Sequence, residues 1–155
     1  MNIRPEVPAD TAAIRTLTTA AFTGKPYSDG TEAAIVDALR AANALAISLV
    51  VEDAGAVVGH VAFSPVTIDG QPGIWYGLGP VSVMPGRQRQ GIGSALIREG
   101  LAQLRARGAG GCLLLGDPAY YGRFGFAADP ALRYGAVDPR YFQMLRFSGD
   151  DPTGE

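Results

Sequence analysis

The most constraining feature of this sequence is a strand that stops at a proline and continues through a glycine-rich turn into an amphipathic helix. Residues 81–96 read Val-Ser-Val-Met-Pro-Gly-Arg-Gln-Arg-Gln-Gly-Ile-Gly-Ser-Ala-Leu. The first turn of such a helix presents unpaired backbone N–H groups and the positive end of the helix dipole, and glycines leave room for an anion. Arg87 and Arg89 could add positive charge suited to phosphate. The segment therefore predicts a phosphate-binding site.

Two common nucleotide-binding motifs fit this segment poorly. A loop that binds ATP or GTP requires Lys followed by Ser or Thr, and this chain has Ile92 and Gly93 at those positions. A dinucleotide-binding fingerprint requires a third glycine, and Leu96 occupies its place. A nucleotide-binding module therefore remains only as an alternative, which predicts affinity for ATP or NAD.

The composition is that of an ordered globular protein. Of the 155 residues, 47% are hydrophobic and 18% are charged, and the formal net charge is −2. This charge offers no general attraction to nucleic acid or to anionic lipid. The start of the chain lacks the apolar core of a signal peptide, and no apolar run approaches the ~20 residues that span a bilayer. We expect a cytoplasmic protein that binds neither nucleic acid nor membrane.

Apolar periodicity predicts a single α/β domain over residues 1–147, followed by a flexible tail over 148–155. Helices are expected between Asp10 and Gly24, from Thr31 through Leu39, over 91–107 and around 119–123; strands are expected over 46–52, 56–66, 74–83, 112–115, 126–132 and 141–147. Asp10 is expected to cap the first helix. Gly100 lies on the apolar stripe of the long helix and lowers helix propensity by about 1 kcal/mol, so we expect a strand to approach it closely.

Two ordered motifs carry a family resemblance. Gln88-Arg89-Gln90-Gly91-Ile92-Gly93 resembles the Gln/Arg-x-x-Gly-x-Gly/Ala signature of the GNAT superfamily of acetyl-CoA-dependent N-acetyltransferases, with Val81, Val83 and Pro85 in their usual places before it. The segment Tyr121-Gly122-Arg123-Phe124-Gly125-Phe126 resembles the Tyr-x-x-x-Gly-Phe ending of the superfamily's fourth helix. Residues 59–66 and 116–126 are similar to an uncharacterised bacterial branch of the superfamily.

The resemblance implies a single-domain α/β fold with a mixed, mostly antiparallel sheet, splayed between strands 4 and 5 and flanked by helices. Acetyl-CoA is the implied co-substrate, with pantetheine paired to the backbone of Val81 and Val83 and the pyrophosphate on residues 88–93. The acetyl-CoA contacts implied in this way are Val81, Ser82, Val83, Gln88, Arg89, Gln90, Gly91, Ile92, Gly93 and Ser94. No metal is expected, because one cysteine and one histidine make no zinc cluster.

Tyr121 is the expected general acid. The family places a tyrosine there, and a phenol with a pKa of about 10 keeps its proton at neutral pH until the thiolate of coenzyme A departs. The alternative is that Tyr121 only packs the short helix, which is the interpretation we favour for its neighbour Tyr120. Asp117 is expected to cap this helix.

The sequence identifies the general base less clearly than it identifies the general acid. Many relatives place a glutamate on the fourth strand, where this chain offers Trp75, Tyr76 and Leu78. His60, the only histidine, and Glu32, at the start of the second helix, are the candidates for base or substrate contact. The alternatives are a packed core histidine and a solvated surface carboxylate, and a water chain could also serve.

The predicted function is transfer of an acetyl group from acetyl-CoA to a primary amine by direct attack in a ternary complex, with a backbone N–H near Val83 stabilising the oxyanion. The alternative is a non-catalytic acyl-CoA-binding or sensor domain. Cys112 opens an apolar strand, so we expect an inert thiol and no acyl-cysteine intermediate. The acceptor is expected to be a small molecule or a peptide amine, and the strand over 141–147 offers an edge for a possible homodimer.

Overall fold

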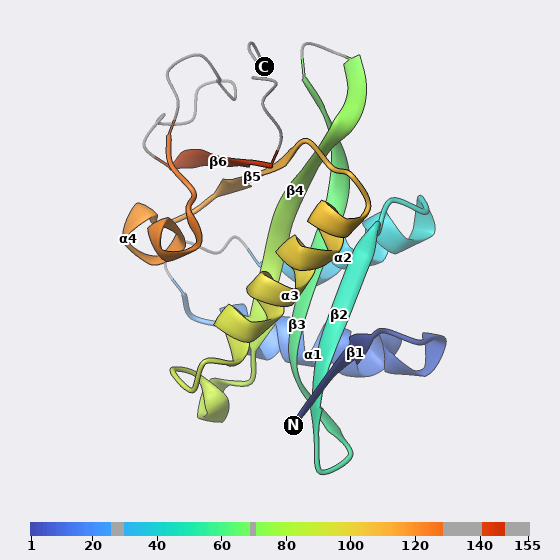
Figure 1. The fold of residues 1–155 in the computed structure, drawn as a ribbon. Helices are drawn as coiled ribbons and strands as arrows, with labels where there is room; N and C mark the ends of the chain where they lie inside the picture. Colours follow the sequence, from blue (N-terminus) through green and yellow to red (C-terminus); the bar gives the residue numbers. More distant parts are fainter. Residues whose placement is uncertain (26–29, 69–70, 129–140, 148–155) are drawn as a thin grey trace. The chain divides into compact units, whose positions relative to one another are not determined.

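The computed structural model describes residues 1–25, 30–68, 71–128 and 141–147. Within them one mixed sheet has the strand order β1-β2-β3-β4-β5-β6 (Figure 1). The elements are β1 (Asn2–Pro5), α1 (Thr11–Phe22), α2 (Glu32–Ala41), β2 (Ile47–Asp53), β3 (Ala56–Ile68), β4 (Gln71–Val83), α3 (Ile92–Ala106), β5 (Gly111–Leu115), α4 (Pro118–Tyr121) and β6 (Phe142–Arg146). The pairs β1–β2, β2–β3 and β5–β6 are antiparallel, and β4 pairs with β5 in parallel. This arrangement confirms the expected α/β sheet flanked by helices.

Strand β1 was missed by the sequence analysis, and the expected role of Asp10 was wrong. Asn2–Pro5 pairs with the outer edge of β2, and so short a segment carries little alternation of its own. Asp10 makes no side-chain cap on α1. Its buried carboxylate instead accepts hydrogen bonds from Arg4, at 2.8 and 3.1 Å, and from the backbone N–H of Val7 at 2.8 Å. The Arg4 guanidinium lowers the pKa of Asp10.

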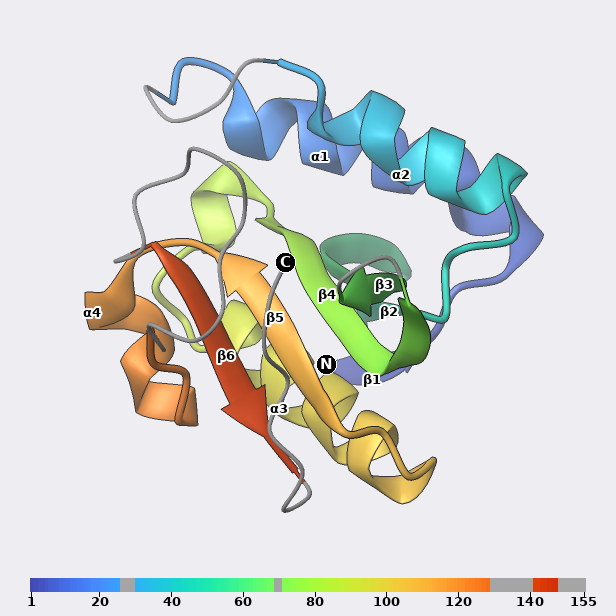
Figure 2. The ribbon, with the colours of Figure 1, turned by 90° about the horizontal axis from the view of Figure 1, so that it is seen from above.

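The chain divides into two compact units, Met1–Ser64 with Gly79–Gly100 and Pro65–Leu78 with Leu101–Glu155, which we call the first and second units. In the first unit, α1 and α2 lie side by side over one face of β2 and β3, and the start of α3 lies over the other face (Figure 2). Ile14, Val36 and Val50 form the core beneath α1 and α2. On the opposite face, a Cβ built on Gly100 would lie 2.5 Å from Cζ of the buried Phe63 ring. The expected close approach of a strand to Gly100 is confirmed.

The core of the second unit gathers around β5. Trp75, Leu113, Phe142 and Met144 form a buried cluster, and Cys112 is completely buried. The parallel ladder joins Trp75–Gly77 to Gly111–Leu113 and ends there, although β4 continues to Val83 and β5 to Leu115. Among the described residues, β4 therefore pairs with β5 only through the part of β4 that belongs to the second unit.

Only part of the expected strand over 126–132 lies within the described residues. There Ala127 forms an isolated antiparallel bridge with Met144. Residues 129–140 and the expected tail over 148–155 lie outside the described residues. Among the helices that are described, none is long and apolar enough to cross a membrane.

Candidate active site

The end of β4 presents backbone groups on its side away from β3. The N–H of Met84 donates to the carbonyl of Val58 on β3 at 2.9 Å. Because backbone polar groups alternate sides along an extended strand, the N–H and carbonyl of Val83 point the other way. The side-chain amide of Gln88 donates to that carbonyl at 3.3 Å and so closes the turn that follows β4.

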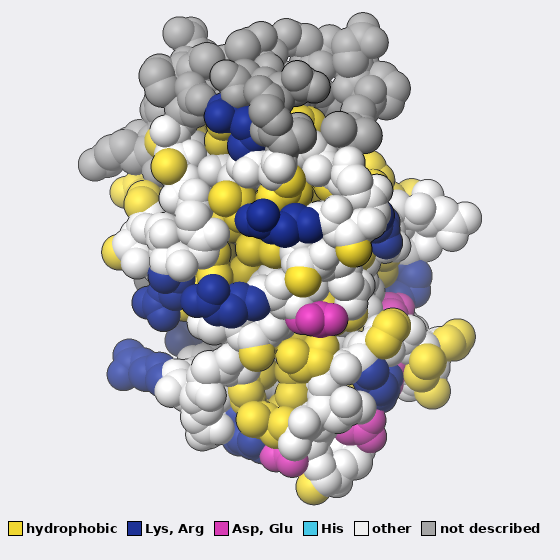
Figure 3. Space-filling model, viewed as in Figure 1, with side chains coloured by type: hydrophobic (Ala, Val, Ile, Leu, Met, Phe, Trp, Pro, Cys, Tyr) yellow, Lys and Arg dark blue, Asp and Glu magenta, His cyan; other side chains and the backbone are white. Residues whose placement is uncertain are grey.

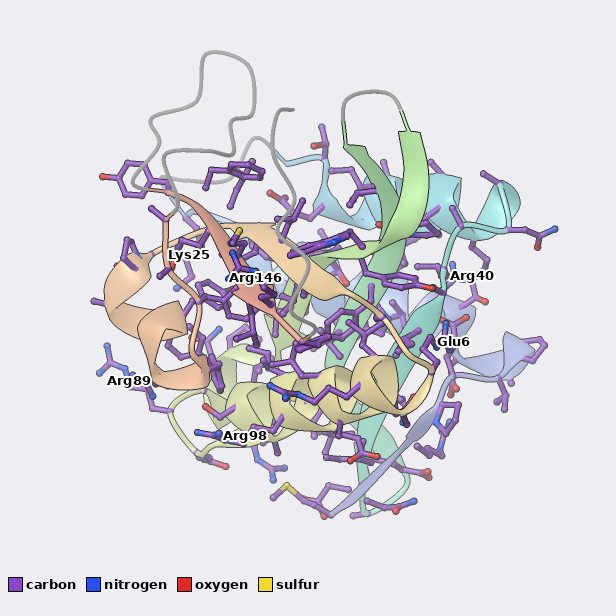
Figure 4. The ribbon with its side chains drawn as sticks, turned by 45° about the horizontal axis from the view of Figure 1, so that its top comes forward. Glu6, Lys25, Arg40, Arg89, Arg98 and Arg146 are labelled. Carbon is purple, nitrogen blue, oxygen red and sulfur yellow. The ribbon has the colours of Figure 1, made fainter. Side chains whose placement is uncertain are left out.

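The loop between β4 and α3 is tied down by Arg87. The Arg87 Nη2 lies 2.8 Å from Oδ2 of Asp53, the last residue of β2, and its Nε donates to Gln90 Oε1 at 3.1 Å. The expectation that Arg87 adds charge for a phosphate is therefore not favoured, because its guanidinium is engaged by a carboxylate. Arg89 is exposed, with φ +65°, and extends away from the loop (Figure 4).

Helix α3 begins over open space. The carbonyl of Gly91 accepts the N–H of Ala95 at 3.0 Å, which makes Gly91 the residue before the first helical one, and its φ is +82°. Apart from the neighbouring residues in the chain, no atom of the described residues lies within 4 Å of where a Cβ on Gly91 or Gly86 would stand. The first N–H groups of a helix point out of this end without partners in the helix itself. The loop thus has room and donors for an anionic group such as a pyrophosphate.

Two of the expected acetyl-CoA contacts have buried side chains. The Ser82 hydroxyl donates to Thr18 Oγ1 at 3.4 Å beneath α1, and the Ile92 side chain packs beside Gly59. Only the backbone groups of these two residues can serve a ligand bound on the loop.

His60 is joined to the surface by a chain of polar side chains from β2, α2 and the segment that follows β1. Its Nε2 lies 2.7 Å from Ser48 Oγ, and the Ser48 hydroxyl donates to the carboxylate of Glu6. Arg40, near the end of α2, binds both oxygens of that carboxylate at 2.9 and 3.0 Å. Glu6 and Arg40 face each other in Figure 4. The imidazole is completely buried, and no histidine reaches the face drawn in Figure 3.

The hydrogen bonds show which of the linked groups Glu6, Ser48 and His60 carries a proton and on which atom. Burial opposes ionisation of Glu6, but hydrogen bonds from Arg40 and Ser48 lower its pKa below the ordinary value. Burial lowers the pKa of His60 to about 4, although the nearby Glu6 carboxylate favours the imidazolium. Because Ser48 uses its proton toward Glu6, a neutral His60 must donate from Nε2 and leave Nδ1 unprotonated. Within the described residues Nδ1 has no hydrogen-bond partner.

A polar pocket of about 340 Å³ opens at the outer end of this chain. Its lining residues are Pro5, Glu6, Arg40, Asn43, Leu45 and Ser48. Glu32, the other candidate base, is half-buried in the first turn of α2, whereas Arg40 is in the last turn. Eight residues of helix separate them by about 12 Å. The structure therefore does not bring Glu32 to the polar chain that holds His60.

Tyr121 lies in the second unit, half-buried at the end of α4. Its ring meets Tyr120 edge-on with centroids 4.9 Å apart, and its centroid is 6.3 Å from that of Phe126. The Asp117 side chain accepts the N–H of Ala119 at 2.9 Å, which confirms the expected cap of this helix.

Sequence reasoning missed three polar residues around His60: Glu6, Ser48 and Arg40. They share no local motif, because Glu6 follows β1, Ser48 lies on β2 and Arg40 lies on α2. Only the alternation along β2 and β3, which places Ser48 and His60 on one face, gave a partial signal.

The comparisons agree with the geometry. Residues 2–128 match a family model described as acetyltransferase (GNAT) domain. The uncharacterized N-acetyltransferase YhbS of Escherichia coli strain K12 is 39% identical over 159 residues, covering 99% of this chain and 92% of that protein. This chain therefore belongs to the GNAT acetyltransferase family.

Two solved structures resemble the chain over nearly its whole length. A GNAT family acetyltransferase from Brucella melitensis, in complex with acetyl-CoA, is 57% identical with a TM-score of 0.89, covering 99% of this chain and 92% of that chain. The structure of Escherichia coli YhbS in complex with CoA is 35% identical with a TM-score of 0.89, covering 99% of this chain and 86% of that chain.

Proposed function

We propose that this enzyme transfers an acetyl group from acetyl-CoA to a primary amine by direct attack within a ternary complex. The observation that carries the proposal is the start of α3, where Gly91 leaves open space before a set of helical N–H groups. Family membership supports an acetyl-CoA-dependent N-acyltransferase. Neither the structure nor the comparisons offer support for a non-catalytic sensor.

In this proposal the loop and the end of β4 hold acetyl-CoA, which supplies an activated thioester. The backbone of residues 88–94 binds the pyrophosphate, and Val81 and Val83 pair with the pantetheine through backbone groups that point away from β3. The N–H of Val83 is the candidate donor for the negative charge that develops on the acetyl oxygen. Arg89 is the basic side chain of the loop that remains available for phosphate, since Arg87 is bound to Asp53.

Direct attack is favoured over an acyl-cysteine route by the state of Cys112. This thiol, the only one in the chain, is completely buried, and burial raises its pKa well above the ordinary value. A protonated and enclosed thiol is a poor nucleophile. The amine would therefore attack the thioester without a covalent enzyme intermediate.

Tyr121 is proposed as the acid that protonates the departing thiolate, and Glu32 as the base that receives the proton of the amine. The choice of Glu32 over His60 depends on access, because the Glu32 side chain is half-buried whereas the His60 imidazole is enclosed and hydrogen-bonded. His60 then contributes by holding the interior of β2 and β3 together rather than by touching the amine.

The test measures release of free coenzyme A thiol with a panel of primary amines. Tyr121→Phe should lower kcat by about a hundredfold or more with unchanged affinity for acetyl-CoA, because acid catalysis typically supplies that much. Tyr120→Phe is the matched control, since it loses the same atom from the adjacent ring. Glu32→Gln should also lower kcat, whereas His60→Gln should retain most activity. Tight coenzyme A binding without amine-dependent thiol release would instead favour the sensor.

A further inference from the structure

Gln143 is a buried polar residue that the proposed function leaves unused. It lies on β6 between Phe142 and Met144, which point into the core of the second unit, so its side chain occupies the opposite face of the strand. Only 1% of it is exposed. Its Nε2 donates to the carbonyl of Gly116 at 2.9 Å, and its Oε1 has no partner among the residues described. Removing the amide therefore breaks one identified hydrogen bond.

Gly116 connects that hydrogen bond to the candidate acid. It follows β5, and its N–H donates to the carbonyl of Tyr141 at 2.9 Å, so both of its backbone polar groups are held by the segment that forms β6. The ring of Tyr121 rests where a side chain on Gly116 would stand. A Cβ there would lie 2.9 Å from Tyr121 Cδ2 and closer still to Cε2.

The helix that carries Tyr121 begins in the same turn. Asp117, the next residue, caps α4, whose four residues continue directly into a 3-10 turn over Gly122–Phe124. A helical segment this short has little rigidity of its own, so the placement of Tyr121 also depends on how the turn before it is anchored. The anchor consists of the Gln143 amide on the Gly116 carbonyl and of the contact between the bare glycine and the tyrosine ring.

We propose that Gln143 and Gly116 are positioning residues that aim the Tyr121 hydroxyl during proton transfer. The inference rests on the proposed role of Tyr121 as the general acid. Proton transfer requires the two heavy atoms to approach within about 2.6–3.2 Å, so a small shift of the ring weakens catalysis while leaving acetyl-CoA binding intact. Gln143 acts on the reaction only through the turn and the ring.

A double-mutant cycle tests this coupling. Gln143→Met keeps the length of the side chain and removes the amide, and Gly116→Ala places a methyl group against the Tyr121 ring. Each change should lower kcat about tenfold with unchanged KM for acetyl-CoA, a fraction of the full contribution of an acid. In the Tyr121→Phe background each should change kcat by less than about twofold, because no acidic proton remains to be aimed. Met144→Leu, on the other face of the same strand, is the matched control and should keep wild-type kcat.

The outcomes separate the inference from the proposed function. Equal losses from Gln143→Met in the wild-type and Tyr121→Phe backgrounds would show that Gln143 acts independently of the tyrosine, and would overturn the inference. Wild-type kcat in Gln143→Met would do the same. Full activity of Tyr121→Phe itself would instead remove the acid role on which the inference depends. If Gln143→Met does not fold, the Gly116→Ala arm of the cycle decides the question alone.

Discussion

His60 should make the stability of the protein depend on pH between pH 7 and pH 5. It is the only histidine in the chain, and its pKa in the folded protein is about 4, against an ordinary value of 6.5. The unfolded chain therefore takes up a proton first as the pH falls. The contribution of His60 is fully present above pH 6.5 and is lost as the pH falls toward 4.

The size of this effect follows from the two pKa values. For one site with these values, the free energy of unfolding should fall by about 2 kcal/mol between pH 7 and pH 5, and by about 3 kcal/mol in all at lower pH. Glu6 adds its own loss only below its ordinary pKa of 4.5, because its folded pKa is lowered. Between pH 7 and pH 5 the loss expected from His60 therefore far exceeds the loss expected from Glu6.

The assay is urea denaturation at several pH values for the wild type and for His60→Gln. The glutamine amide can donate to Ser48 as the imidazole Nε2 does, but it cannot take up a proton. We expect the wild type to lose about 2 kcal/mol over this interval and the variant to stay nearly flat. The same pH dependence in both proteins would refute the reasoning, as would an NMR titration that places the imidazole pKa near 6.5.

Three further predictions concern packing, the loop and the thiol. Gly100→Ala should destabilise the protein by about 1–3 kcal/mol in urea denaturation, because its methyl group meets the Phe63 ring. In a Phe63→Leu background the same substitution should stabilise the protein by up to about 1 kcal/mol. Destabilisation in both backgrounds would contradict the close approach of Phe63 to Gly100. Gly91→Val should weaken acetyl-CoA binding in calorimetry by about tenfold or more, whereas Gly91→Asn, which tolerates a positive φ, should weaken it less. Equal acetyl-CoA affinities of Gly91→Val and the wild type would show that the loop does not bind acetyl-CoA. Cys112 should react with a thiol reagent only after unfolding, and rapid labelling of the native protein would contradict its burial.

Much of the fold and the ligand loop could be predicted from the sequence, because these features depend on residues that are neighbours along the chain. The cap at Asp117 and the change from β4 to α3 at Pro85–Gly91 each depend on a few adjacent residues with particular backbone preferences. Gly100 shows how far such reasoning extends. Its poor helix propensity predicted a close neighbour, but the helical stripe alone did not identify Phe63.

The partners of the buried polar groups were decided only by the tertiary structure. Four polar residues meet because strand register and helix packing bring them together: Glu6 after β1, Arg40 on α2, Ser48 on β2 and His60 on β3. Gln143 reaches Gly116 across 27 positions of sequence for the same reason. A polar side chain in a strand pattern signals only that a partner is needed, since burying it unpaired is costly. Which partner supplies the hydrogen bond depends on how distant segments pack. The spacing of residues along the chain does not predict this packing.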